Sequence, residues 1–176
     1  MFYIPENFRL EMIALHGEVD GRAWLDRLPT ILSDCERRWK ISIDPPFPNL
    51  SFNYVAPARR ADGTRVIVKA SSPTDEFKWE SEALRLFDGH GMAQLLDSNK
   101  DDEVMLLEYL SPGTLLRDVE DDEAATSVAA SVMRAMWRPA PEHHSFKTVQ
   151  DWGKGFTRLH KHFNGGSGPF PPALLE

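Results

Sequence analysis

Apolar side chains recur at helical spacing through the first 39 residues, so that they share one face of each predicted helix. The pattern predicts two helices, over residues 6–16 and 20–39. The second has the longer apolar stripe, which consists of Trp24, Leu25, Leu28, Ile31, Leu32, Cys35 and Trp39. Asp20 is a residue type that caps helix N-termini. Pro29 favours a restart of the helix, with the proline in the first turn.

Short runs of apolar and β-branched residues follow and predict a small sheet. The first strand is expected to begin within residues 40–43 and to end at Asp44-Pro45-Pro46. Residues 53–58 and 65–70 are two further strand-like runs. The Asp62-Gly63 pair between them is a strong turn signal, so the two runs are expected to form a β-hairpin.

A helical pattern interrupts the strand-like runs at residues 76–88. Pro73-Thr74-Asp75 is expected to open this helix, and Gly89 is expected to cap its C-terminus. Two short strands, at 92–96 and 104–107, complete the predicted sheet. The order therefore predicts a small sheet with one helix inserted after its third strand.

The chain after the break at Ser111-Pro112-Gly113 has helical periodicity, over roughly 121–137 and 147–163. Strands grouped together and followed by helices indicate an α+β protein. We expect one lobe over residues 1–110 and a second, helical part over residues 111–176.

Composition and charge exclude several classes of partner. Hydrophobic residues make up 41% of the chain, as in soluble globular proteins. The net charge of −7 argues against a nucleic-acid or anionic-membrane partner, because each needs a basic face. Cys35 is the single cysteine, so an intrachain disulfide is impossible and a reducing compartment fits. Without a signal-like N-terminus, or an apolar run near the ~18 residues that span a bilayer, we expect a cytoplasmic protein.

Val66-Ile67-Val68-Lys69 is the most informative stretch, because an ammonium ion at the end of a fully apolar strand needs a partner. On a helical wheel, Glu80 falls in the middle of the apolar face formed by Phe77, Ala83, Leu84 and Phe87. Each charge satisfies the other if the helix packs on the strand. In protein kinases such a pair holds the lysine against the α- and β-phosphates of ATP. The alternative is that Lys69 reaches solvent and Glu80 forms an ordinary surface pair.

Leu107-Glu108-Tyr109-Leu110, at the end of the last strand, resembles a kinase hinge, in which main-chain groups of Glu108 and Leu110 would bind the adenine edge. The alternative is a strand that runs into a plain turn. The loop before the hairpin, residues 48–53, lacks the glycines that let backbone amides approach phosphate. Ser51 and Asn53 are the residues there that offer N–H and side-chain donors instead, unless the loop is a plain connection.

A set of short motifs appears in one order along most of the chain. It consists of Trp24-Leu25 with Leu28-Pro29, Ser51-Phe52-Asn53-Tyr54-Val55, Asp62-Gly63-Thr64, Val68-Lys69, Glu80 with Ala83-Leu84-Arg85-Leu86, Leu95-Leu96-Asp97, Leu106-Leu107-Glu108, Pro112-Gly113 and Trp137-Arg138-Pro139. No single motif is specific. The ordered set resembles the aminoglycoside/hydroxyurea antibiotic resistance kinases, the group of streptomycin phosphotransferases.

The resemblance implies a protein-kinase-like fold, with ATP and Mg²⁺ as cofactors. The implied reaction is phosphoryl transfer to a hydroxyl of a small molecule, an aminoglycoside-type antibiotic such as streptomycin. Lys69 matches the phosphate-binding lysine of the family and Glu80 its helix partner. Residues 108–110, which are Glu108, Tyr109 and Leu110, match the hinge.

A kinase of this type also needs a catalytic His-Gly-Asp loop followed by an Asn, and a later Asp that binds Mg²⁺. The chain contains no His-Gly-Asp. Asp151-Trp152-Gly153 is similar to the metal-binding Asp-Phe-Gly motif, but Trp152 lies on an apolar helical stripe, which favours packing. The histidine pairs 143/144 and 160/162 do not share a helix face, so they indicate no metal site. We expect the chain to be the N-terminal portion of such a kinase, inactive alone, with its catalytic Asp and metal ligands outside it.

Two other functions remain open. One is a non-catalytic interaction or regulatory module that retains a kinase-like lobe. The other is a kinase for a different small metabolite. If the chain is the N-terminal portion of a kinase, the apolar stripe over residues 149–163 lacks the later helices on which it would normally pack, and such a patch favours self-association. A homodimer through this stripe, or a marginally stable chain, is therefore expected.

Overall fold

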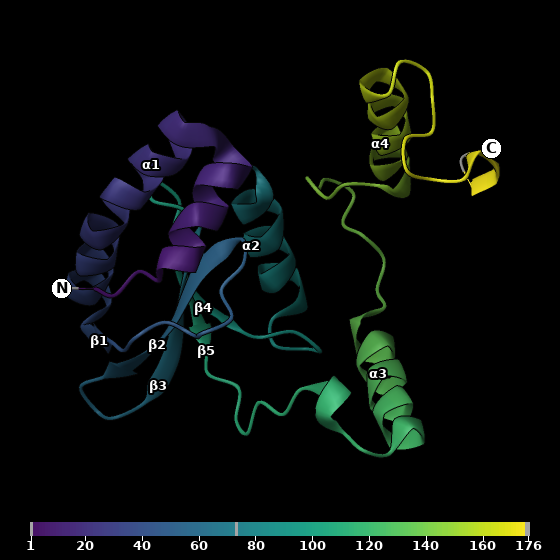
Figure 1. The fold of residues 1–176 in the computed structure, drawn as a ribbon. Coiled ribbons are helices and arrows are strands. Elements are labelled where there is room, and N and C mark those ends of the chain that lie inside the picture. Colours follow the sequence, from purple (N-terminus) through teal and green to yellow (C-terminus); the bar gives the residue numbers. More distant parts are fainter. Residues whose placement is uncertain (1, 73, 175–176) are drawn as a thin grey trace. The chain divides into compact units, whose positions relative to one another are not determined.

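The computed structural model describes residues 2–72 and 74–174, which form two compact units, the first ending at Ala140 and the second beginning at Pro141. The helices of the first unit are α1 (Glu6–Trp39), α2 (Glu76–Phe87) and α3 (Asp122–Met136). Its strands are β1 (Ile41–Ile43), β2 (Asn53–Arg60), β3 (Arg65–Ser71), β4 (Leu95–Asn99) and β5 (Val104–Glu108). The second unit contains α4 (Val149–His162), and 3₁₀ turns lie at Leu116–Asp118 and Pro172–Leu174 (Figure 1). The predicted α+β class is confirmed.

The strands form one antiparallel sheet in the order β1-β2-β3-β5-β4. The predicted hairpin joins β2 to β3. In its turn Gly63 has a left-handed φ of 85°, and Asp62 Oδ1 accepts a hydrogen bond from the Thr64 amide at 2.9 Å. The register pairs Val55 with Lys69 and Lys69 with Met105 across the three central strands. The insertion of α2 between β3 and β4 is also confirmed.

The two predicted N-terminal helices are the two limbs of α1, which meet at Gly17 (φ 84°, ψ 165°). Two details of the prediction are wrong. Asp20 does not cap the second limb, because helical dihedrals resume directly after Gly17 and include Asp20. Pro29 does not restart the helix but lies inside the second limb. The neighbouring Leu28 and Ile31 are buried against the sheet, and this packing offsets the backbone hydrogen bond that a proline removes.

Gly21 allows the two limbs of α1 to pack closely. It is buried, and a Cβ atom at this position would lie 2.8 Å from the Met12 carbonyl oxygen and 3.0 Å from the Cα of Ile13. Both of those atoms are backbone, so the first limb cannot yield by rotating a side chain. The close approach of the limbs therefore requires a glycine.

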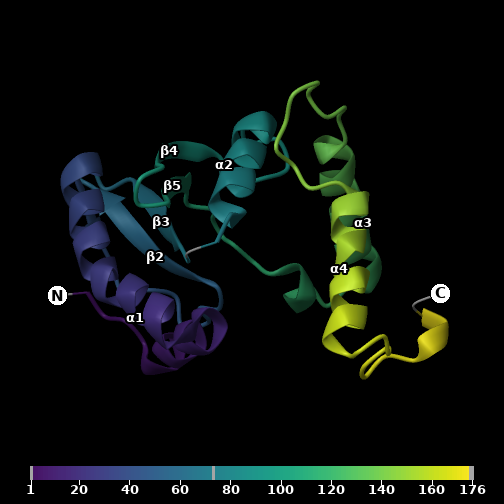
Figure 2. The same ribbon diagram turned by 90° about the horizontal axis from the view of Figure 1, so that it is seen from above.

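Successive strand residues point to opposite faces of the sheet, so the two faces carry separate cores. The core under α1 includes Val66, Val68, Val104 and Leu106. The core under α2 includes Ile67, Phe77, Leu84, Met105 and Leu107. Figure 2 shows the two helices on opposite faces of the sheet. By the same alternation, Lys69 lies on the face that α2 partly covers.

The position of β4 differs from the prediction. The strand begins at Leu95 rather than at residue 92, and it continues to Asn99. The prediction followed the apolar run, whereas the pairing with β5 extends along polar residues, with a register irregularity between Leu95 and Asp97. An edge strand tolerates these residues because they find partners outside the sheet. Asp97 Oδ2 accepts a hydrogen bond from Trp39 Nε1, and Ser98 Oγ accepts one from Arg85, each at 2.7 Å.

The C-terminus of α2 is capped by Asp88, which has a left-handed φ of 44°, and not by the predicted Gly89. Gly89 also has a positive φ, 77°, so the chain leaves the helix through two left-handed residues. At the other end of α2, Asp75 is the N-cap. Pro73, predicted to open the helix, lies outside the described residues.

The second unit contains the predicted apolar stripe on α4. Val149 is 91% exposed, Trp152 70% and Phe156 54%. Self-association through this stripe stays a prediction, as does the predicted division of the chain after residue 110. Within residues 2–72 and 74–174, no helix combines the length and the apolar character needed to cross a membrane.

Two glycine-to-alanine substitutions in helices should have opposite effects on stability. Gly21→Ala places a methyl group against backbone and should lower the free energy of unfolding by about 1–3 kcal/mol. Gly153→Ala, in α4, meets no atom within 4 Å and should raise helix stability by up to about 1 kcal/mol. Urea unfolding followed by circular dichroism measures both. A Gly21→Ala variant as stable as the wild type would refute the close packing of the two limbs.

Candidate functional site

The structure brings Lys69 and Glu80 together on the α2 face of the sheet. Phe77 and Leu84 lie three residues before and four after Glu80, and both are buried, so α2 docks with Glu80 at its contact face. The Lys69 Nζ atom lies 2.5 Å from Glu80 Oε1. The two side chains are 18% and 31% exposed, so both charges are partly shielded from solvent. A charge-assisted contact between partly buried groups restricts the position of the ammonium.

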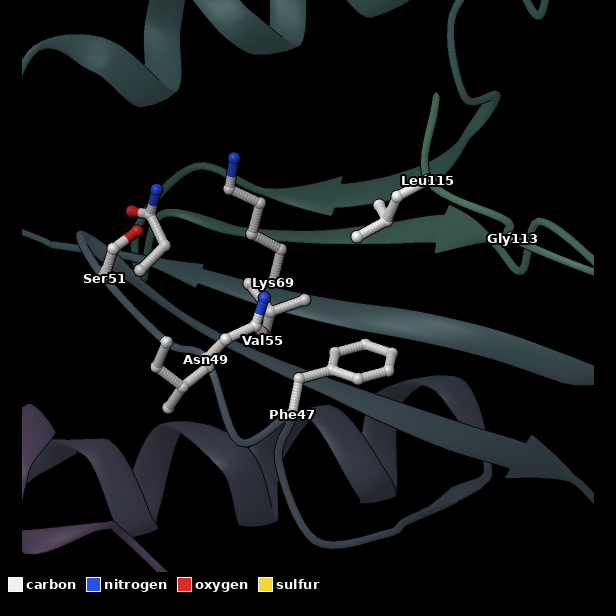
Figure 3. A pocket seen from close by; sticks show the side chains of 9 residues that line it. Phe47, Asn49, Ser51, Val55, Lys69, Gly113 and Leu115 are labelled. Carbon is white, nitrogen blue, oxygen red and sulfur yellow. The ribbon is translucent and has the colours of Figure 1, made fainter. Parts of the chain in front are cut away.

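A cavity of about 510 Å³ opens beside this pair. It is lined by Phe47, Asn49, Leu50, Ser51, Asn53, Val55, Lys69, Gly113 and Leu115. In Figure 3 the Lys69 side chain rises from β3 with Ser51 on one side and Leu115 on the other. The lining therefore comes from the 47–51 loop, the central hairpin and the segment that follows β5. Lys69 is the one basic residue among these nine.

A second cavity of about 430 Å³ continues from the first, since both are lined by Phe47, Val55 and Gly113. Its further lining residues are Ile67, Ala93, Leu107, Glu108, Tyr109, Leu110 and Pro112. Most of these side chains are apolar. The cleft thus has a cationic compartment at Lys69 and an apolar compartment along the end of β5. An elongated ligand with an anionic end and a flat apolar end matches this division.

The loop over residues 47–51, which lines the cationic compartment, contains no glycine, and backbone hydrogen bonds fix the chain that leads into it. The Phe47 amide donates to the Val55 carbonyl at 3.0 Å, and the Asp44 amide donates to the Pro57 carbonyl at 2.8 Å. Asn53 Oδ1 accepts a hydrogen bond from the Ser72 amide at 3.1 Å, which ties the start of β2 to the end of β3. Of the Asn53 side chain, the Nδ2 group is the donor that remains for a ligand.

The predicted hinge residues Glu108, Tyr109 and Leu110 all line the apolar compartment. Glu108 makes two hydrogen bonds to Gln94. Its amide donates to the Gln94 carbonyl at 3.0 Å, and its Oε1 atom accepts from the Gln94 amide at 2.7 Å. The Glu108 N–H and carboxylate therefore already have partners. Tyr109 also contacts a residue that does not line the cavity. The Arg65 guanidinium lies 3.7 Å from its ring centroid.

Asp151, whose Asp-Trp-Gly sequence is similar to a metal motif, has a structural role in α4. Its carboxylate completes a capping box with Thr148, and its Oδ1 atom lies 2.6 Å from Lys154 Nζ. The hydrogen bond from Lys154 and those from Thr148 lower the pKa of the Asp151 carboxyl below its usual value.

His144 stacks on Phe146 with ring centroids 5.2 Å apart. Within the described ranges, no three His, Cys, Asp or Glu residues lie close enough together to hold a metal.

Ten of the sixteen residues that line the two cavities were not among the predicted site residues. Val55 and Ile67 were recoverable, because the hairpin register places Val55 beside Lys69, and Ile67 lies two residues before Lys69 on the same face. Phe47 and Leu115 gave no comparable signal, since each lies in a segment with no regular structure. Gly113 did give a signal, as the glycine of the Ser111-Pro112-Gly113 break in the chain. Its φ of 71° favours glycine, and a Cβ atom there would lie 3.2 Å from the Leu110 carbonyl oxygen.

Comparison with known proteins now decides the family. The sequence profile of the aminoglycoside/hydroxyurea antibiotic resistance kinases matches residues 38–169. The chain belongs to this family. It is 35% identical over 139 residues to a protein named streptomycin 6-kinase from Streptomyces glaucescens, and 34% identical over 140 residues to one from Streptomyces griseus. It is also 31% identical over 126 residues to a hydroxyurea phosphotransferase from Kitasatospora aureofaciens.

These matches cover most of this chain but only part of each relative. The two streptomycin 6-kinases are matched over 78% and 79% of this chain and 45% of their own length. The hydroxyurea phosphotransferase is matched over 70% of this chain and 37% of its own length. The chain thus spans less than half of the length of these kinases. The sequence resemblance that predicted the family is confirmed.

A double-mutant cycle measures the contact that holds Lys69 at the edge of the cleft. With Lys69→Met, Glu80→Gln and the double variant, we expect a coupling free energy of about 1–2 kcal/mol, because both groups are largely shielded from water. Urea unfolding supplies the four stabilities. Arg22 and Glu18 provide the control, because this pair is 62% and 68% exposed on one helix, and its coupling should be no more than about 0.5 kcal/mol. Equal coupling in the two pairs would contradict the shielded position of Lys69.

Proposed function

We propose that this chain forms the nucleotide-binding lobe of an ATP-dependent kinase that phosphorylates a hydroxyl of an aminoglycoside-type antibiotic such as streptomycin. The observation that carries the proposal is the Lys69–Glu80 pair, whose lysine lines a cavity that continues into an apolar compartment. Family membership supports phosphoryl transfer as the reaction, and the names of two relatives support the antibiotic as acceptor.

The cationic compartment suits the phosphates of ATP. A triphosphate needs a fixed positive charge and hydrogen-bond donors, and Lys69 supplies the charge. Glu80 holds its ammonium in place. Ser51 and Asn53 line the same compartment and contribute side-chain donors. Because the 48–53 loop contains no glycine, these side chains take over part of the role that backbone amides have in glycine-rich loops.

The apolar compartment suits the adenine ring. Val55, Ile67 and Leu107 line it, and a flat ring gains most from burial between such side chains. We assign the adenine edge to main-chain groups of the Glu108–Leu110 segment. The Glu108 N–H is not one of them, because it already donates to Gln94. Tyr109 also lines this compartment, and the Arg65 guanidinium lies over its ring.

The cleft residues fit the nucleotide better than they fit Mg²⁺ or a catalytic base. No Asp or His is among the described residues that line the two cavities, and the one lining carboxylate, Glu108, accepts from Gln94. Glu80 is paired with Lys69. We therefore assign ATP as the phosphoryl donor, and we assign no metal-binding or proton-accepting step to the described residues of this cleft.

Nucleotide titration tests the assignment of Lys69. Lys69→Ala should weaken binding of a non-hydrolysable ATP analogue by about tenfold or more, because a charge-assisted contact to phosphate is lost. The same substitution should leave adenosine binding unchanged, since adenosine has no phosphate. Calorimetry gives both affinities, and Lys78→Ala, an exposed lysine on α2, is the matched control. Equal weakening of analogue and adenosine, or no binding of either by the wild type, would count against the proposed function.

Phosphoryl transfer should be absent from the purified 176-residue chain. The cleft lining offers no base to accept the proton of an attacking hydroxyl, so streptomycin should remain unmodified in the presence of ATP and Mg²⁺. Mass spectrometry of streptomycin after prolonged incubation measures this directly. Stoichiometric formation of phosphostreptomycin would show that the chain supplies a base which the cleft residues do not reveal.

A further inference from the structure

The C-terminal end of α2 is held by an arginine from a distant part of the chain. Arg138 follows α3, and its Nη1 atom donates a hydrogen bond to the Leu86 carbonyl oxygen at 2.7 Å. The same guanidinium lies over the Phe87 ring, with Cζ 5.0 Å from the centroid. Leu86 and Phe87 are the last two residues of α2. The contact therefore joins the end of this helix to the chain that follows the hinge segment.

A second contact brings the same two segments together. Gly91 lies four residues beyond α2, and a Cβ atom there would lie 2.7 Å from Met136 Cγ and 3.3 Å from the Val132 carbonyl oxygen. Met136 is the last residue of α3, two positions before Arg138. The end of α3 thus packs directly on the turn after α2. This packing places Arg138 at the end of the neighbouring helix.

The chemistry of this contact is that of a helix C-cap. The last carbonyl groups of a helix lack intrahelical partners and carry partial negative charge. At this end of α2, the Leu84 carbonyl accepts a hydrogen bond from the Asp88 amide, and the Phe87 carbonyl accepts one from the His90 amide. Arg138 satisfies the Leu86 carbonyl and adds a positive charge at the negative end of the helix dipole. Stacking on Phe87 keeps the guanidinium in this position.

We propose that Arg138 is a positioning residue for the nucleotide cleft. It caps α2 from the chain beyond the hinge and thereby fixes the helix on which Glu80 meets Lys69. Glu80 lies in the middle of α2, and Phe77 and Leu84 are its buried anchors. Fraying of the last turns frees Leu84 first and then the carboxylate that holds Lys69. The effect on the nucleotide rests on the proposed function, whereas the effect on α2 does not.

Amide hydrogen exchange tests the cap without any ligand. In Arg138→Ala the amides of residues 80–87 should exchange about two- to fivefold faster, the range expected for loss of a cation at a helix C-terminus. Arg138→Lys keeps the charge and should restore most of the protection. Arg134→Ala is the matched control, because Arg134 is an exposed arginine of α3 with no hydrogen bond or ion pair in the described ranges. Exchange in β2 and β3 should be the same in all four proteins.

Nucleotide affinity tests the consequence for Lys69. Arg138→Ala should weaken binding of the non-hydrolysable ATP analogue about two- to fivefold and leave adenosine binding unchanged. In a Lys69→Ala background the same substitution should have no further effect, because the cap acts through that lysine.

Each result decides the proposal. It is overturned if Arg138→Ala exchanges like Arg134→Ala, or if protection falls equally in α2 and in the sheet, since Arg138 would then contribute only to general stability. It is also overturned if the analogue and adenosine are weakened alike, or if neither is weakened while the wild type binds both. If the wild type binds no nucleotide, the proposed function fails, and the exchange measurement alone establishes or refutes the cap.

Discussion

The contact between the Lys69 ammonium and the Glu80 carboxylate determines where the cleft lies. β3 alternates between its two faces, so Val66 and Val68 enter the core under α1 while Lys69 points toward α2. An ammonium ion in that place needs an anionic partner, because desolvation without one costs several kcal/mol. The helix that provides the partner must pack over β5 and leave the β2 side of the same face open. The cavity beside Lys69 is that open part of the sheet.

The cleft is assembled from segments that are far apart in sequence but held together by backbone pairing. The β2–β3 hairpin places Val55 beside Lys69, and the β3–β5 ladder places Leu107 beside Ile67. Loop residues complete the lining, because Phe47, before the hairpin, and Gly113, after residues 108–110, each border both cavities. A change of one residue in the register would turn Lys69 into the core under α1, where no carboxylate faces it among the core residues.

The sequence was sufficient where a local rule and a burial requirement coincided. The Asp62-Gly63 turn, the helix around Glu80 and the pairing of Glu80 with Lys69 each followed from periodicity combined with the cost of an unpaired charge. Prediction failed where tertiary contacts overrode a local preference. Pro29 is tolerated inside α1 because its neighbours are buried on the sheet, and β4 runs through the polar Asp97 because its pairing with β5 continues. The contact of Arg138 with the end of α2 could not be predicted, because the residues adjacent to Arg138 in sequence do not indicate a carbonyl 52 residues earlier as its partner.

The absence of glycine from residues 48–53 changes how the cleft can bind an anion. Glycine-rich loops bring backbone amides directly against phosphate, and these amides are already ordered before the ligand arrives. Here the loop is flanked by the hydrogen bond from the Phe47 amide to the Val55 carbonyl and by the one from the Ser72 amide to Asn53 Oδ1. Under the proposed function, the side chains of Ser51 and Asn53 are its assigned donors. A side chain loses rotamer freedom when it binds, which reduces the net gain from each such contact. Lys69 is the exception among the donors, because Glu80 has already restricted it. Under the proposed function, the fixed position of the Lys69 ammonium therefore compensates for the missing backbone cradle.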